Sequence, residues 1–347
     1  MQAVLPLGLL FLSFCLSAIA IIPFIDLLYK INFKRAKQKT IDAFGKPTPI
    51  FDHFHAKKAG TPVGGGMLVI AIVSILFMII LPLLEFFEVP ITFNHLKNPG
   101  TEISVLLFTF LSFGILGLYD DIKKFFGFKK SGFFGLRMPQ KLLIQIILAL
   151  IISFTLYYSL GISILNVPFI GTFELGWLYV PFATFVIVAF ANAVNITDGL
   201  DGLASGTLLF SMIGLWIISM SILDVPLSIF IGLFIGSLIA FLYFNIYPAR
   251  LFLGDVGALS FGATFAVIGL LLGKPIALVI IGAIFVLEIG SSFIQLLSKR
   301  FRHKKIFPVS PIHLYLQKIG WEEPKIVQRF WLIQIMFTLF GIWVTLL

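Results

Sequence analysis

Apolar runs of about 20 residues recur along this chain, and they constrain its fold more than any other feature. A helix of that length crosses the hydrocarbon core of a bilayer, and a helix satisfies its backbone polar groups internally in lipid. We therefore predict an all-α integral membrane protein with ten transmembrane helices. The predicted spans are residues 4–25, 66–87, 103–119, 142–160, 178–194, 203–222, 227–246, 256–272, 276–297 and 327–346.

The composition excludes an ordinary soluble protein. Of 347 residues, 59% are hydrophobic and only 12% are charged. No polar stretch is long enough to fold alone, so we expect residues 1–347 to form a single polytopic domain. Cys15 is the only cysteine, which excludes an internal disulfide, and it lies inside the first predicted span. That span lacks the basic start of a signal peptide, and we expect it to be retained.

Basic residues are distributed unevenly between the two sides of the predicted bundle. The loops at 26–65, 120–141 and 298–326 hold eight, six and seven of them, and with Arg250 and Arg329 one side carries 23 of 25. Because such residues stay cytoplasmic in short loops, both termini should lie outside. This one-sided charge suits anionic lipid or an anionic substrate, and we expect no nucleic-acid partner. The segment 162–177 predicts a small outer hairpin.

Four short polar motifs occur at the ends of these helices, all on the basic side. Three are acidic: Asp120-Asp121, the segment Asn192–Ala204, which contains Asp198 and Asp201, and Asp255. The fourth, Ser310-Pro-Ile-His313, contributes a histidine. A charged side chain near the bilayer is costly and therefore usually functional. A merely solvated turn would need neither the asparagines nor the glycines of the longest motif. The predicted topology gathers these motifs into one inner-face active-site cleft.

The residue types indicate phosphoryl transfer. Clustered aspartates repel one another unless a cation joins them, and oxygen ligands without cysteine favour Mg²⁺ or Mn²⁺ over zinc. Lys123, Lys124 and Lys141 supply positive charge for phosphate oxygens. Nearby glycines permit close backbone approach to a ligand. Together these features point to transfer from a nucleotide-linked donor to a membrane-embedded acceptor.

Several motifs in this order resemble the polyprenyl-phosphate N-acetylhexosamine-1-phosphate transferases (glycosyltransferase 4). The segment Gly320–Trp331 resembles the phospho-N-acetylmuramoyl-pentapeptide transferase branch in particular. The other motifs that carry the resemblance are Thr61-Pro-Val-Gly-Gly-Gly66, Asp120-Asp121, Lys141, Asn192–Ala204, Asn245–Asp255 and Ser310–His313. The resemblance implies ten helices with both ends outside, in agreement with the charge count, in a bacterial plasma membrane with the site facing the cytoplasm.

The resemblance also implies a reaction. UDP-N-acetylmuramoyl-pentapeptide and undecaprenyl phosphate would give lipid I and UMP, with Mg²⁺ as the cofactor and the lipid bilayer as a further partner. A homodimer is compatible with the sequence.

Residue roles follow from the same motifs. Asp120 and Asp121 would handle the carrier phosphate and the metal, and Asp255 would ligate Mg²⁺. Asn195 and Asp198 would position the pyrophosphate, and Lys141 would offset its charge. The uridine pocket would be formed by Lys58, Gly199, Leu200, Asp201, Asn245 and Phe252. His313 would face the sugar and its peptide. Simpler alternatives stay open: a lipid-facing Phe252, an Asn245 that caps a helix end, and a Lys58 that only adds to the inner-side charge.

One departure from the family pattern concerns the donor. The family has three consecutive histidines after Pro-Ile, whereas here His313 is followed by Leu314 and Tyr315. A sister transferase that uses UDP-N-acetylglucosamine therefore remains an alternative. A second alternative, a cation-coupled transporter, would need carboxylates near the bilayer midplane rather than at helix ends.

The ionisation of the acceptor bears on the mechanism. A phosphate monoester has its second pKa near 6, so most of it is already a dianion at pH 7. A strong base is then unnecessary, and the harder task is to bring two anions together. We therefore favour direct attack by the carrier phosphate over a covalent aspartyl intermediate, with Asp120 as the base if one is needed.

Overall fold

The computed structural model describes residues 4–35, 58–89, 99–126 and 136–346. Long helices dominate, in the order α1 (Val4–Lys30), α3 (Gly65–Phe86), α4 (Pro99–Phe126), α5 (Met138–Phe154), α6 (Tyr179–Thr197), α7 (Leu203–Ser221), α8 (Val225–Asn245), α9 (Gly254–Leu271), α10 (Pro275–Ile281), α11 (Ala283–Phe301), α12 (Ile312–Lys318) and α13 (Glu323–Leu346). A π-helical turn, Thr155–Ser159, continues α5, and a 3-10 turn, Gly176–Leu178, precedes α6. The basic residues Lys37, Lys39, Lys46, Lys57, Lys97, Lys129 and Lys130 lie outside the described residues.

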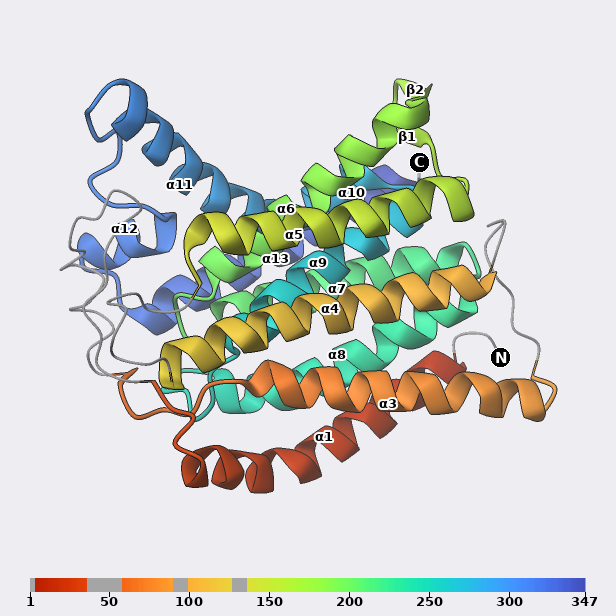
Figure 1. Cartoon of the computed structure of the whole chain (residues 1–347), viewed down its shortest axis with the longest axis horizontal. Helices are drawn as coiled ribbons and strands as arrows, with labels where there is room; N and C mark the ends of the chain where they lie inside the picture. The colour runs from red at the N-terminus through yellow and green to blue at the C-terminus, as the bar shows by residue number, and fades with distance from the viewer. Residues whose placement is uncertain (1–3, 36–57, 90–98, 127–135, 347) are drawn as a thin grey trace.

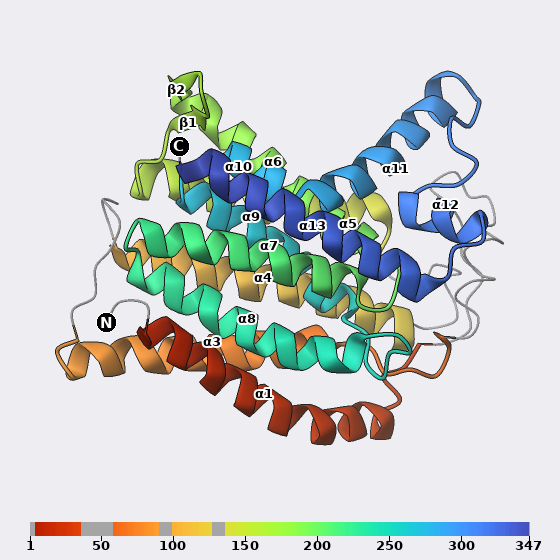
Figure 2. The same ribbon diagram turned by 180° about the vertical axis from the view of Figure 1, so that it is seen from behind.

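The prediction of ten membrane spans is confirmed. Within the described residues, nine helices are long and apolar enough to cross a bilayer, and the number is ten when one bent pair is taken as a single span. Helices α7, α8 and α9 are mostly buried, whereas α1, α3, α5 and α13 expose many apolar side chains. Figures 1 and 2 show how these helices run alongside one another in the bundle. Such an apolar outer surface is what lipid requires, and the chain is an integral membrane protein.

The span predicted at 276–297 is bent in the structure. It is broken into α10 and α11, which meet at an angle of 82°. At the break, a Cβ on Gly282 would lie only 2.6 Å from the Phe190 ring, so the position has room only for glycine. Ser211 donates to the Ile281 carbonyl at 2.9 Å, and Gln334 also donates to it. These side chains replace helical hydrogen bonds that the bend removes.

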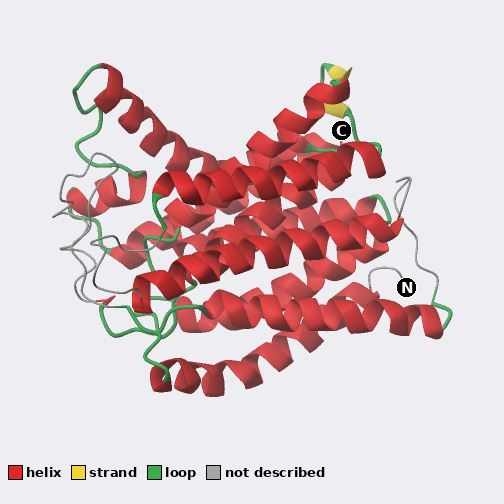
Figure 3. Ribbon diagram, in the orientation of Figure 1, coloured by secondary structure: helices red, strands yellow, loops and turns green. Residues whose placement is uncertain are grey.

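The two ends of the bundle differ in what they carry. The start of α1, the end of α13 and the β-hairpin lie at one end, whereas the end of α4, the start of α9 and α12 lie at the other (Figures 1 and 3). The predicted hairpin is confirmed: β1 (Ile164–Val167) pairs antiparallel with β2 (Gly171–Glu174). The arrangement agrees with termini on the side opposite the acidic motifs, and which side faces the cytoplasm stays a prediction.

Candidate active site

Four charged side chains from three helices form one compact group, which we call the ion cluster: Asp120 and Lys124 of α4, Lys141 of α5 and Asp255 of α9. Asp120 Oδ2 lies 3.2 Å from Lys124 Nζ and 3.0 Å from Lys141 Nζ. Lys124 Nζ also lies 2.8 Å from Asp255 Oδ2, and Lys141 pairs with the same oxygen. Each lysine thus bridges both carboxylates, so charges that are far apart in the sequence neutralise one another at one point.

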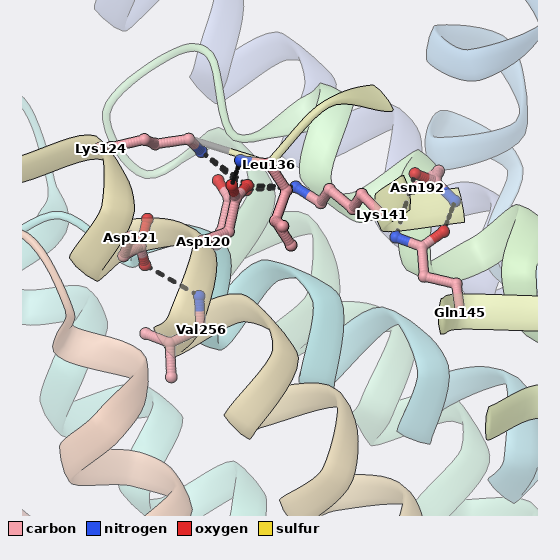
Figure 4. A network of polar contacts seen from close by, with 9 residues as sticks. Asp120, Asp121, Lys124, Leu136, Lys141, Gln145, Asn192 and Val256 are labelled. Carbon is pink, nitrogen blue, oxygen red and sulfur yellow. Dashed lines mark hydrogen bonds and ion pairs between the residues drawn. The ribbon is translucent and has the colours of Figure 1, made fainter. Parts of the chain in front are cut away.

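A backbone group completes the surroundings of Asp120. The Leu136 N–H donates to Asp120 Oδ1 at 2.6 Å, which leaves Oδ2 to both lysines (Figure 4). Asp120 is buried, and it sits in the last turns of α4, which extends seven residues beyond the predicted end of the third span. The lengthened helix is what carries Asp120 and Lys124, four residues apart, on one face.

Asp121 points to a different partner from its neighbour. Its Oδ2 accepts the Val256 N–H at 3.0 Å, at the first turn of α9 (Figure 4). A carboxylate there compensates unpaired N–H groups and the positive end of the helix dipole. A Cβ on Gly254 would lie 2.7 Å from the same oxygen. Asp121 therefore joins α4 to α9 and helps to hold Asp255 in the ion cluster.

The donor atoms at this site are compatible with Mg²⁺. Asp120, Asp121 and Asp255 offer only hard carboxylate oxygens, and Cys15 lies exposed on α1. In the part of the chain that the structure describes, no three Asp, Glu, His or Cys side chains are arranged to hold a metal ion. Mg²⁺ typically takes only one or two protein carboxylates and completes its shell with water and phosphate. The residues therefore fit this ion without forming a closed cage for it.

An amide pair joins the ion cluster to the Asn192–Ala204 motif. Asn192 Nδ2 of α6 donates to Gln145 Oε1 of α5 at 2.6 Å, one helical turn from Lys141 (Figure 4). Asn195 lies in the last turn of the same α6, and Asp198 directly follows that helix. The pair therefore fixes the end of α6 next to the lysine that bridges Asp120 and Asp255.

Asp198 lies where the charges of the site meet. Burial and the negative charge of Asp255 raise the pKa of its carboxyl well above the usual range, and the nearby Arg35 and Lys58 oppose that rise. Asp198 therefore interacts electrostatically with Asp255 of the ion cluster and with Lys58 of a second charged group. A buried carboxylate with a raised pKa is typical of a functional site.

That second charged group consists of Lys58, Asp201 and Glu323. Lys58 Nζ lies 2.7 Å from Asp201 Oδ1 and 2.6 Å from Glu323 Oε1. Glu323 Oε1 also accepts the Asp201 N–H at 2.6 Å, and Asp201 Oδ2 accepts the Ala249 N–H at 3.0 Å. The first residue of α13 thereby holds the turn between α6 and α7. Lys58 does more than add to the charge of one side.

The remaining predicted pocket residues have structural partners. Asn245, the last residue of α8, accepts from Ser205 Oγ at 2.6 Å and donates to the Leu251 carbonyl at 2.9 Å. Its side chain thus fastens the segment that leads to Phe252 to the start of α7. The Leu200 side chain is buried against α11 and α13 residues in a small hydrophobic cluster.

Phe252 does not simply face lipid. Its backbone joins the segment before α3, since the Phe252 N–H donates to the Pro62 carbonyl at 2.9 Å. The Arg35 guanidinium lies 5.7 Å from the centre of its half-buried ring. The ring therefore carries a cation over its face, and that cation interacts electrostatically with Asp198, Asp201 and Glu323.

His313 lies at the start of α12 and faces the longest motif. Its Nδ1 is 2.9 Å from Glu288 Oε2. A Cβ built on Gly199 would lie 2.4 Å from His313 Nε2, so the ring directly faces that glycine. His313 therefore meets the turn that follows Asp198.

Sequence reasoning missed four of these participants: Arg35, Gln145, Glu288 and Glu323. Glu288 gave a usable signal, because it is the only acidic residue in the apolar run 276–297 and an ionisable residue inside a span is usually functional. Glu323 and Gln145 gave none, since nothing in their local sequence indicates a partner more than 40 residues away.

Comparison with known proteins accounts for this arrangement. The glycosyl transferase family 4 profile matches residues 103–273. The chain is 38% identical over 284 residues to phospho-N-acetylmuramoyl-pentapeptide-transferase of Clostridium perfringens strain SM101, covering 82% of each chain. It is 37% identical over 307 residues to that of Desulfotalea psychrophila, covering 83% of this chain and 80% of the relative. For the protein of Oceanobacillus iheyensis the identity is 35% over 294 residues, covering 84% and 85%.

The chain belongs to the phospho-N-acetylmuramoyl-pentapeptide-transferase family. The resemblance found in its motifs is thereby confirmed. Residues 103–273, which match the broader glycosyl transferase family 4, include the whole ion cluster and the Asn192–Ala204 motif. Lys58 and His313 lie outside that range.

Proposed function

We propose that this transferase moves phospho-N-acetylmuramoyl-pentapeptide from its UDP-linked donor to undecaprenyl phosphate, giving lipid I and UMP. The observation that carries the proposal is the ion cluster, in a chain whose relatives bear the name of this activity. Two anionic substrates must meet for the reaction, and Lys124 and Lys141 are placed together where their charge can be shared between phosphates. The related N-acetylglucosamine transferase and the transporter are not favoured.

The chain's own residues have distinct tasks in this scheme. Lys124 and Lys141 exchange their carboxylate partners for phosphate oxygens as substrates enter, which lowers the repulsion between the two anions. Asp120 orients the carrier phosphate, which attacks the donor phosphorus directly, because that phosphate is already mostly a dianion at pH 7. Asn195 and Asp198 hold the pyrophosphate region, and Lys58, Asp201 and Phe252 border the uridine.

Mg²⁺ is part of the proposal. Asp255, with Asp121, would hold the ion, which would neutralise charge on the phosphates and the departing UMP. The remaining proposed features are an active site on the cytoplasmic side of a bacterial plasma membrane and an acceptor that reaches the site from the bilayer.

The test supplies the purified full-length chain with Mg²⁺, undecaprenyl phosphate and one of two donors. UMP release is measured with UDP-N-acetylmuramoyl-pentapeptide and, in parallel, with UDP-N-acetylglucosamine. We expect release, and a lipid-linked product, with the first donor only. Glu174→Gln, on the exposed strand β2, serves as a carboxylate control and should match the wild type. Release with UDP-N-acetylglucosamine alone would assign the sister activity, and release with neither would refute the proposal.

A further inference from the structure

We infer that Glu288 is a positioning residue that sets the orientation and the protonated ring nitrogen of His313. Both carboxylate oxygens are devoted to this one histidine. Oε2 lies 2.9 Å from His313 Nδ1, and Oε1 accepts the His313 main-chain N–H at 3.2 Å. A carboxylate can only accept, so Nδ1 carries the hydrogen. The ring is therefore held with Nε2 pointing away from Glu288.

The direction of Nε2 connects Glu288 to the proposed reaction. Nε2 faces Gly199, so closely that a Cβ there would lie 2.4 Å away. Gly199 follows Asp198, which interacts electrostatically with Asp255 of the ion cluster. The His313 ring therefore supports the turn at Gly199, next to the Asp198 that we propose holds the pyrophosphate region of the donor. The inference rests on the proposed function for that role of Asp198.

Side chains of helix α11 bind the main chain of the segment that leads to His313. Gln295 Oε1 accepts the Ile306 and Phe307 N–H groups at 3.1 and 3.0 Å, and Ser298 donates to the Lys304 carbonyl at 2.8 Å. Glu288, Gln295 and Ser298 are seven and three residues apart, so they share one face of α11. Each is buried, and each binds main chain of the segment 304–313. The 82° bend before α11 sets the direction of this face.

Energetics argue against a purely structural role for Glu288. It is 0% exposed and His313 is 1% exposed. Removing a carboxylate from water is costly, and an apolar residue of similar volume would often stabilise a fold as well or better.

The kinetic test is a double-mutant cycle on the full-length chain. Glu288→Ala should lower kcat by roughly 10- to 100-fold, by analogy with the partners that orient metal-ligating histidines. If Glu288 acts through His313, then Glu288→Ala combined with His313→Ala should be no worse than His313→Ala alone. If the fold-losses in kcat from the two single substitutions multiply in the double variant, the two residues act independently and the inference is wrong. Glu174→Gln again serves as the carboxylate control.

A readout independent of activity separates this inference from the proposed function. In protein labelled with ¹⁵N-histidine, the signal that disappears in His313→Ala identifies His313 among five histidines. We expect a proton on Nδ1 in the wild type, and its loss or redistribution in Glu288→Ala. If that variant does not fold, Glu288→Gln, which keeps the side-chain volume, should weaken the ¹⁵N signal of the protonated Nδ1. A wild-type His313 without a proton on Nδ1 would refute the inference, even if the chain transfers the expected donor.

Discussion

Gly117 of α4 lies directly against the main chain of Asp255 at the start of α9, so closely that a Cβ on Gly117 would be 2.2 Å from the Asp255 carbonyl oxygen. Asp120 is one helical turn beyond Gly117. The close approach of the two helices therefore brings Asp120 and Asp255 to the same two lysines. One missing side chain allows the ion cluster to form.

Gly117→Ala should damage the site from a distance. An extra methyl group in a packed interface costs about 1–3 kcal/mol, more than the roughly 0.5–1 kcal/mol that alanine gains over glycine in a helix. We expect a lower melting temperature in detergent and a large loss of UMP release. Gly8→Ala is the matched control, since nothing lies within 4 Å of a Cβ at Gly8 in α1. Equal behaviour of the two variants would contradict this account.

Asp255→Asn should abolish most of the activity while the protein stays folded. The substitution keeps the shape but removes the charge that Lys124 and Lys141 share, together with the proposed metal ligand. Loss of charge stabilisation should reduce turnover by at least about a hundredfold. Chelation of divalent cations should stop UMP release by the wild type, and Mg²⁺ should restore it. Near-normal release from the variant would exclude Asp255 as the central ligand.

Asp198→Asn should raise stability while it lowers activity. Because burial and Asp255 raise the pKa of the Asp198 carboxyl in the folded state, the folded protein binds more protons there than the unfolded chain does. This group's contribution to stability therefore falls as the pH rises from about 4, the ordinary value for an aspartate, through the raised folded-state pKa. Asparagine does not ionise, so the Asp198→Asn variant does not lose this stability as the pH rises.

Thermal unfolding of metal-free protein across a pH series measures this effect. The gain in melting temperature of Asp198→Asn over the wild type should be absent below about pH 4 and should grow as the pH rises. A gain that is largest in acid would reverse the sign of the argument. Glu174→Gln on the exposed hairpin should show no such trend.

Direct attack by the carrier phosphate can be separated from a covalent route. Without the carrier, donor and Mg²⁺ should release no stoichiometric burst of UMP, because the first bond cannot break before the acceptor binds. The steady-state rate should level off above about pH 6–7, where the carrier phosphate is ionised. One UMP per enzyme, with a phosphosugar trapped on Asp120, Asp121 or Asp255, would instead establish the aspartyl intermediate.

The sequence by itself determined the membrane class, the spans and the family. Lipid imposes these through length and hydrophobicity alone, so runs such as 203–222 and 227–246 correspond closely to α7 and α8. The hairpin also followed from local turn residues. The aspartates could be recognised because charge near a bilayer is costly wherever it occurs.

The tertiary structure alone decided which charges meet. The bend at Gly282 could not be seen in a continuous apolar run, since it depends on Phe190 leaving no room for a side chain and on Ser211 and Gln334 binding the Ile281 carbonyl. The pairing of Glu323 with Lys58 spans 265 residues. Hydrophobic periodicity specifies how a helix faces its surroundings, but the neighbours that it meets are chosen by packing of the whole bundle.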